Sequence, residues 1–371
     1  MALNATTAAN VCLIVQKQLE NIMGDTAPGS IQKPTGMLDA LLSPLNRNGF
    51  EAIPSKMFEG KGMPVEDLLP KIEIKFELPD CVEADETEPT PCGSASNSGL
   101  PWGFREFNMN PDNVLSSEFQ VTQGTFDRVC ERRDDTISVL MRKHMDRIVN
   151  SLEKKMIELV YANAGNYAEG ISSVTTPKEL LLYGVSTGQP YANPAAFLEL
   201  KSQYRRMFSD NKTPIIVGDD ALARYFDMRG LAGLGQNSLN ADPRFGGAAP
   251  FISLFMDTVL NPAQEQEYHG LSWLPGTTQL VTWNKYKGEW AELSDPRVVR
   301  TTMQYRGLEF DYTMFKDPCG PTWYFTVSLH YDLFAITSSE MTDCYDFNYI
   351  LHWLFDCGDS TCANLLPTLL T

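Results

Sequence analysis

The fold of this protein is decided by residues 125–164, whose sequence is TFDRVCERRDDTISVLMRKHMDRIVNSLEKKMIELVYANA. The stretch contains no Pro and no Gly, the two residues that are most costly inside a helix. Its apolar side chains recur mostly at steps of three and four residues, which places them on one face of a helix. This face comprises Phe126, Val129, Cys130, Ile137, Leu140, Met141, His144, Met145, Ile148, Leu152, Met156, Leu159 and Val160.

The ends of this predicted helix carry start and stop signals. Thr125 is suited to be the N-cap with Asp127 in the first turn, and Gly165 is suited to stop the helix. At 1.5 Å per residue the helix would be roughly 55–60 Å long, so we expect it to cross a flat or extended molecule. The alternative is a kinked pair of ordinary helices, because helices beyond 25 residues are unusual in globular proteins.

Length and composition indicate a folded protein of two or three domains. The chain has 371 residues, of which 43% are hydrophobic and 21% charged. Its net charge of −17 disfavours a protein whose main task is to grip a nucleic-acid backbone, although it is compatible with enclosing nucleic acid. No stretch is apolar for long enough to predict a membrane span, and the apolar residues 11–15 follow no basic region, so no secretory signal is expected.

Cysteine usage predicts neither a disulfide framework nor a metal centre. Eight cysteines are few for a chain of this length, which favours synthesis in a reducing cytoplasm. Cys81 and Cys92, like Cys357 and Cys362, are too widely spaced for a CxxC metal pair.

The residues before the long helix predict an arm and a hairpin. Residues 1–24 have the stripe of an amphipathic helix, and the Pro- and Gly-rich stretch that follows to about residue 64 predicts an extended arm lying on another surface, or else a mobile terminus. Residues 71–78 alternate strictly between apolar and charged side chains, as a half-solvated strand does. With weaker strands at 103–109 and 118–122, they predict a long hairpin whose tip is the acidic loop 80–99.

The middle of the chain predicts a second helix at 194–208, a short buried strand at 213–217 and a helix that begins at Asp219 and Asp220. A strand followed by a helix N-terminus can bind an anion, but these two carboxylates would repel phosphate. Gly230, Gly233 and Gly235 do not form a dinucleotide-binding fingerprint. Residues 246–276 are predicted to be loops with one short apolar piece at 251–255.

The last third of the sequence is rich in predicted strands. These are residues 277–283, then 298–305 and 308–315 joined as a hairpin by Arg306-Gly307, and finally 323–333, whose odd-numbered residues are all apolar. We expect this last strand to pack against the apolar face of the long helix. The tail 341–371 is too apolar at 347–355 to remain in water, so it should dock on the body or on a neighbouring subunit.

A search for catalytic motifs yields no catalytic, cofactor-binding or metal-ligating residue. His144, His269, His330 and His352 lie outside HExxH, Cys-His and G-x-S-x-G contexts, and no P-loop is present. The sequence therefore predicts a protein that is not an enzyme and binds no cofactor or metal. An enzyme with an unrecognised site remains an alternative.

The order of these elements resembles the major capsid proteins of tailed bacteriophages, whose fold is named after phage Hong Kong ninety-seven. The local sequences that carry the resemblance are KIEIKFELPDC (71–81), the long helix RVCERRDDTISVLMRKHMDRIVNSLEKKMIELVYANAG (128–165), TPIIVGDDALARYF (213–226), WLPGTTQLVTWNKYKGEW (273–290) and LEFDYTMFKDPCGPTWYFTVSLHYDLFAI (308–336). The resemblance spans about residues 60–336 and rests on element order and on loosely matching segments. The family's Lys–Asn cross-link has no matched residues here.

The resemblance implies an α+β fold with an N-terminal arm at 1–60, an extended hairpin loop at 61–124, and a spine helix with the start of a peripheral domain at 125–194. An axial domain at 195–290, closing strands of the peripheral domain at 291–340 and the C-terminal apolar tail at 341–371 complete the division. Residues after 341 have no counterpart in the resemblance.

The implied function is that of a structural capsid subunit. It would assemble in pentamers and hexamers, in the bacterial host cytoplasm, into the icosahedral shell of a virion that encloses double-stranded DNA. The implied partners are other copies of itself, with scaffold, portal and capsid-decorating proteins as further candidates and no membrane. The alternatives are an encapsulin-like cage, a soluble enzyme, and an oligomeric adhesin or tail component.

Overall fold

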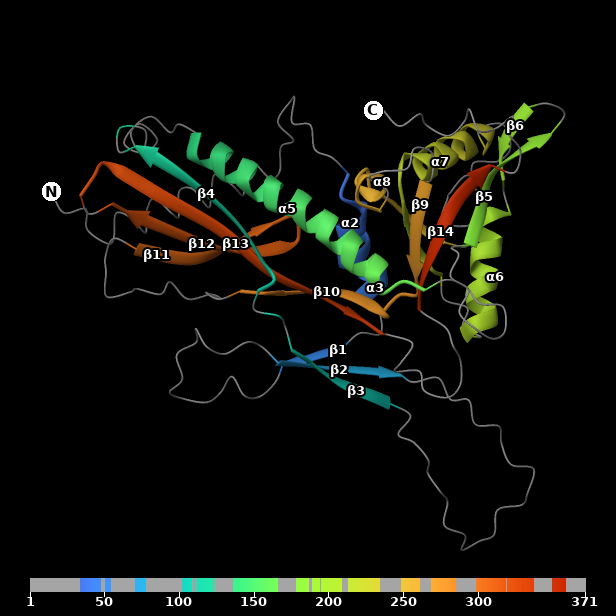
Figure 1. Cartoon of the computed structure of the whole chain (residues 1–371), viewed down its shortest axis with the longest axis horizontal. Helices are drawn as coiled ribbons and strands as arrows, with labels where there is room; N and C mark the ends of the chain where they lie inside the picture. Colours follow the sequence, from blue (N-terminus) through green and yellow to red (C-terminus); the bar gives the residue numbers. More distant parts are fainter. Residues whose placement is uncertain are drawn as a thin grey trace, which may run out of the picture.

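The computed structural model describes residues 34–47, 51–54, 71–77, 102–108, 110, 112–122, 124, 136–165, 178–186, 189–193, 195–208, 213–233, 248–260, 268–284, 298–317, 319–336 and 349–357. Figure 1 shows these residues as a long helix lying across an elongated plate of sheets. The helices are α2 (Gly36–Leu42), α3 (Pro44–Arg47), α5 (Thr136–Ala162), α6 (Ala196–Phe208), α7 (Asp220–Gly233) and α8 (Met256–Leu260). The strands are β1 (Glu51–Pro54), β2 (Lys71–Glu77), β3 (Trp102–Asn108), β4 (Val114–Thr122), β5 (Lys178–Ser186), β6 (Gln189–Ala192), β7 (Ile215–Gly218), β8 (Ala249–Ile252), β9 (Tyr268–Trp273), β10 (Thr278–Trp283), β11 (Val298–Tyr305), β12 (Leu308–Lys316), β13 (Thr322–Ala335) and β14 (Ile350–Cys357).

The long helix α5 has the predicted apolar face. Its buried residues include Ile137, Met141, Met145, Ile148, Val149, Leu152, Met156, Ile157 and Val160. They recur with the period of a helix and therefore line one side of it. The helix is continuous over 27 residues, a length of about 40 Å, so this part is not a kinked pair. The predicted N-terminal part, with Thr125 and Asp127, lies outside the described residues.

The predicted stop at Gly165 is wrong in position and in mechanism. The helix ends at Ala162, where the side chain of Asn163 closes it by donating from Nδ2 to the carbonyl of Leu159 at 2.8 Å. Gly165 instead bonds to strand β14: its N–H donates to the carbonyl of Ile350, and its carbonyl accepts from the N–H of His352. The chain after the helix is therefore fixed by a sheet and not by a glycine cap.

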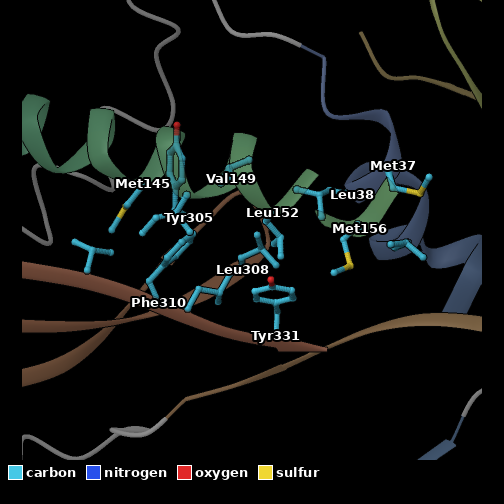
Figure 2. Close-up of a cluster of buried hydrophobic side chains, with 14 of the residues drawn as sticks. Met37, Leu38, Met145, Val149, Leu152, Met156, Tyr305, Leu308, Phe310 and Tyr331 are labelled. Carbon is cyan, nitrogen blue, oxygen red and sulfur yellow. The ribbon is translucent and has the colours of Figure 1, made fainter. Parts of the chain in front are cut away.

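A five-stranded antiparallel sheet lies beneath α5. Its strands follow the order β10-β13-β12-β11, and β4 pairs with β13 from Thr322 to His330. The odd-numbered residues of β13 from Trp323 to Leu333 are buried against α5, as the alternation predicted. Figure 2 shows part of this core, with Met145, Leu152 and Met156 of the helix above Leu308, Phe310 and Tyr331 of the sheet.

The β11–β12 hairpin confirms the predicted Arg306-Gly307 turn. Both residues have positive φ, 51° and 75°, which is the left-handed conformation that a two-residue type I′ turn needs at each central position. The register Tyr305↔Leu308 follows directly from this turn.

A six-stranded mixed sheet forms the other end of the plate, in the order β6-β5-β14-β9-β7-β8. One prediction here is wrong, because the supposed loop 246–276 contains β8, α8 and β9. The predicted apolar tail does dock on the body, through β14, which lies centrally between β5 and β9. Both β9 and β14 are buried on both faces, so neither has the alternating pattern that reveals a half-solvated strand.

The predicted 71–78 hairpin is confirmed as β2 and β3, paired from Lys71↔Asn108 to Glu77↔Trp102. Two details differ from prediction. The strand predicted at 118–122 is β4 of the five-stranded sheet, and the third strand beside the hairpin is β1, which the sequence had placed in the extended arm. This three-stranded sheet, β1-β2-β3, stands apart from the other two sheets in Figure 1. The loop 80–99 and residues 1–33 lie outside the described residues.

Candidate functional site

The N-terminal segment 35–47 is docked on the body of the protein, although its Pro and Gly content predicted an extended arm. Helix α2 lies against α5, with Met37, Leu38 and Leu41 almost fully buried in the same core as the long helix (Figure 2). Its apolar residues therefore gain their stability from long-range contacts, not from local propensity. We treat this seat as the candidate functional site, because it fixes residues 35–47 on the body through buried hydrogen bonds.

Glu153 of α5 holds the N-terminus of α2. Its Oε1 accepts hydrogen bonds from the N–H of Met37 at 2.9 Å and from Ser253 Oγ at 2.5 Å, and its Oε2 accepts from the N–H of Leu38 at 2.9 Å. A carboxylate here satisfies helix donors that would otherwise have no partner. The side chain is completely buried, and burial raises its pKa to about 7 against the opposing effect of these hydrogen bonds; the charge of Asp39 adds to the increase.

Asn46 of α3 forms a second buried anchor. Its Nδ2 donates to the carbonyls of Leu41 and Thr278, at 3.2 and 2.7 Å. Its Oδ1 accepts from Trp273 Nε1 at 3.1 Å, and its own carbonyl accepts from Gln279 Nε2 at 2.7 Å. One amide side chain thus joins the N-terminal segment to both large sheets. The fixed geometry of these bonds places the segment in a single position.

We expect the substitution Gly36→Ala to displace α2 from its seat. A Cβ at residue 36 would lie 2.2 Å from the carbonyl oxygen of Ile252, which is backbone and cannot rotate away. Overpacking of this kind typically costs about 1–3 kcal/mol of unfolding free energy. Denaturant unfolding measures the loss. The matched control is Gly124→Ala, because no atom lies within 4 Å of a Cβ there. Equal stability of the two variants would contradict the docking.

The stability of the chain should fall as the pH rises from about 4.5 to about 7. The folded-state pKa of Glu153 is about 7 and its ordinary value is 4.5, so the folded state holds the extra proton in this interval. The stabilisation is complete below 4.5 and is lost as the pH passes 7, with a nominal size of about 3 kcal/mol. Burial also raises the pKa of Asp39, although the charge of Arg306 lowers it in part. Asp39 therefore changes the stability with pH in the same direction as Glu153 does.

Denaturation midpoints at pH 5 and pH 8, compared between the wild-type chain and Glu153→Gln, isolate this contribution. Gln cannot ionise, so the difference between the two pH values should shrink by the part due to Glu153. At pH 5 the variant should be about as stable as the wild-type chain, since the protonated carboxyl that it replaces also places one donor against these N–H groups. An unchanged pH dependence would show that Glu153 does not titrate in the folded chain.

Two histidines that lie far apart in the sequence meet in the six-stranded sheet. His269 Nδ1 and His352 Nε2 lie 2.9 Å apart, and the rings stack with centroids 5.1 Å apart. Burial, followed by the neighbouring His269, lowers the pKa of His352 to about 4, so this imidazole is neutral at physiological pH. Tyr161 of α5 packs edge-on against it. The pair therefore joins β9 to β14 by a hydrogen bond, and Tyr161 adds a ring contact from α5.

The predicted strand-to-helix junction at Asp219 is confirmed, and its carboxylates are used internally. Asp219 Oδ1 accepts from the N–H of Ala221 as the N-cap of α7, and Asp220 pairs with Arg224 one turn along at 3.2 Å. Burial first, and then the hydrogen bond and charge of Asp257, raise the pKa of Asp219 well above its ordinary value. The positive end of α7 is thus complemented by its own carboxyls, so this helix start is not arranged to bind phosphate.

The remaining histidines also lie in packed surroundings. His144 Nδ1 is 2.6 Å from Ser117 Oγ, and its ring stacks on Phe119 between α5 and β4. The His144 residue is only 7% exposed. His330, predicted on the polar face of its strand, packs edge-on against Trp283. Within the described ranges no three His, Cys, Asp or Glu side chains are grouped as metal ligands, and no helix is long and apolar enough to cross a membrane. Of the cysteines considered above, 81, 92 and 362 lie outside the described residues.

Sequence reasoning named none of the residues of this seat. Glu153 had one available signal, since it is a charged residue directly beside the buried face between Leu152 and Met156. Asn46 had none, because all its partners except Leu41 and Ser43 are more than 200 residues away in the chain.

No family model and no curated relative matches the chain. Solved structures do match it. The capsid of Ralstonia phage GP4 is 10% identical with a TM-score of 0.39, covering 78% of this chain and 84% of that one. The mature capsid of bacteriophage PhiM1 is 8% identical with a TM-score of 0.40, covering 77% and 82%. A structure from Mycobacterium phage Bobi is 10% identical with a TM-score of 0.41, covering 92% and 98%. In its described residues the chain is an α+β protein, and these three similar structures come from bacteriophages.

Proposed function

We propose that this chain is a structural major capsid protein that self-assembles into the icosahedral shell of a double-stranded DNA bacteriophage. The observation that carries the proposal is the three-stranded sheet β1-β2-β3, which stands apart from both large sheets (Figure 1). Its central strand β2 alternates apolar and charged residues in the sequence, as a strand does when one face is covered. A sheet that is apolar on one face buries that face against another layer. We infer that a neighbouring copy supplies that layer.

The rest of the plate fits the same role. A 27-residue helix packed on long strands makes a stiff, elongated unit, and the buried bonds at Glu153 and Asn46 fix where the N-terminal segment leaves it. Contacts between different surfaces of successive copies close into rings when the rotation permits. Pentamers and hexamers of such a unit would tile a closed shell. Scaffold, portal and capsid-decorating proteins are further proposed partners, and assembly in the host cytoplasm is the proposed location.

We retain the proposed division into an N-terminal arm (1–60), extended loop (61–124), spine helix with the start of the peripheral domain (125–194), axial domain (195–290), closing strands (291–340) and C-terminal segment (341–371). Two of these regions each contribute a strand to a sheet that is formed mainly by other regions. Strand β4 of the 61–124 region belongs to the five-stranded sheet, and β14 of the last region belongs to the six-stranded sheet. We also propose that the chain carries no catalytic, cofactor-binding or metal site.

Electron microscopy of the purified full-length chain tests the proposal. Closed shells of uniform diameter are the expected result, with large oligomers in light scattering at micromolar concentration. A stable, monodisperse monomer under native conditions would refute it. The encapsulin-like alternative is distinguished by content: particles isolated from infected cells should hold nuclease-protected DNA, whereas a cage of that kind would hold protein cargo.

A further inference from the structure

The solvent-facing side of α5 carries a row of basic side chains. Lys143, Arg147 and Lys154 are exposed, and they follow one another at intervals of four and seven residues, which return to the same side of a helix. We call these three residues the basic stripe. At 1.5 Å per residue the stripe is about 17 Å long.

The carboxylates of α5 are engaged with other partners. Asp146 Oδ1 accepts from the hydroxyl of Tyr305 at 2.6 Å, and Glu158 pairs with Lys155, also at 2.6 Å. Glu153 is buried beneath α2. Within the described part of the chain, no ion pair is recorded for any residue of the basic stripe. The pKa of His144 is lowered mainly by burial and, to a smaller extent, by the positive charge of Arg147.

The opposite face of the plate has the opposite charge. The outward residues of the five-stranded sheet include Glu118, which is exposed, and Glu309 and Asp332, which are half-buried. The other outward residues of β4 near Glu118 are uncharged, namely Ser116, Gln120 and Thr122. Among the described residues, the exposed charges of α5 are therefore mainly cations, whereas the outward face of the five-stranded sheet carries these carboxylates, in a chain whose net charge is −17.

We infer that the helix face of the plate lines the inside of the shell, where the basic stripe contacts the phosphates of the enclosed duplex DNA. This inference rests on the proposed function. A duplex carries one charge per about 1.7 Å, so a stripe of about 17 Å lies along about ten phosphates. A strongly acidic chain would repel the genome through most of its surface, and a positive inner face removes that repulsion locally. Three cations give weak, salt-sensitive contacts that read no sequence.

Chemical labelling of intact shells tests which face is inside. An amine-reactive ester attached to a polymer too large to cross the shell should leave Lys143 and Lys154 unmodified, and both should react once the shells are dissociated. In the variant Glu118→Lys, the new amine on the sheet face should react in intact shells. Reaction of Lys143 and Lys154 in intact shells, to the extent seen at position 118 of the variant, overturns the inference. Failure to form shells would instead refute the proposed function itself.

Binding of a short DNA duplex by the full chain, below the concentration at which it assembles, tests the contact. The logarithm of the binding constant should fall linearly with the logarithm of salt concentration, and the double variant Lys143→Ala/Arg147→Ala should reduce that slope by about 2. The matched control is Lys201→Ala/Arg205→Ala, which removes a Lys and an Arg four residues apart from α6 and should leave the slope unchanged. Undetectable binding by the parent chain at low salt, or equal slopes for both double variants, overturns the inference.

Discussion

Ile148→Asp is expected to abolish folding and assembly. Ile148 lies near the middle of α5, 3% exposed, in the core that the helix shares with the five-stranded sheet. An Asp there would bring an unpaired charge into an apolar interior, which costs several kcal/mol even when the carboxyl protonates instead. Loss of that size is comparable with the whole stability of an ordinary domain. The measurements are circular dichroism of the soluble fraction and electron microscopy of any particles.

The control for this variant is Ser151→Asp, which places the same charge three residues away on the exposed side of the same helix. It should fold and assemble like the parent chain, since surface substitutions usually change stability by less than about 0.5 kcal/mol. Soluble, assembled particles of Ile148→Asp would show that this face of α5 is not buried.

Trp353→Ala is expected to destabilise the six-stranded sheet by about 3–5 kcal/mol, the usual cost of removing a buried Trp. The side chain is fully buried in the middle of β14, and its Nε1 donates to Ser272 Oγ at 2.6 Å. Alanine leaves a cavity and takes the donor away from that hydroxyl, which also contacts Tyr204. Denaturant unfolding of the full-length chain gives the magnitude.

Leu198→Ala on α6 is the matched control, because Leu198 is 61% exposed and its truncation removes little buried area. A loss below about 1 kcal/mol for Trp353→Ala would contradict the central position of β14 in the six-stranded sheet.

The sequence alone determined the elements whose side chains alternate between core and solvent. The period of the apolar residues located α5 and α6, and strict alternation located β2 and β13, the latter with the correct inward face. The Arg306-Gly307 turn was predictable because a two-residue hairpin requires φ values that few residues adopt. These signals are local, because buried and exposed positions of a half-buried element alternate along the chain with the period of that element.

Elements that are buried on both sides lack this alternation of apolar and polar residues. The apolar residues of strands β9 and β14 do not alternate with polar ones, so their sequences do not separate a central strand from a loop or a docking tail. The short helix α2 is held at its N-terminus by Glu153, more than 100 residues away, and no pattern within residues 36–42 could indicate that partner.

The tertiary structure alone decided which polar residues meet. The seat of the N-terminal segment, the His269–His352 pair and the Asp219–Asp257 contact each join residues from different elements, and their partners are set by strand order. The sequence determined that α5 would have an apolar and a polar side; the fold decided what lies against each. Burial of Glu153 became favourable only because three hydrogen-bond donors converge on it, and such convergence is a property of packing in three dimensions.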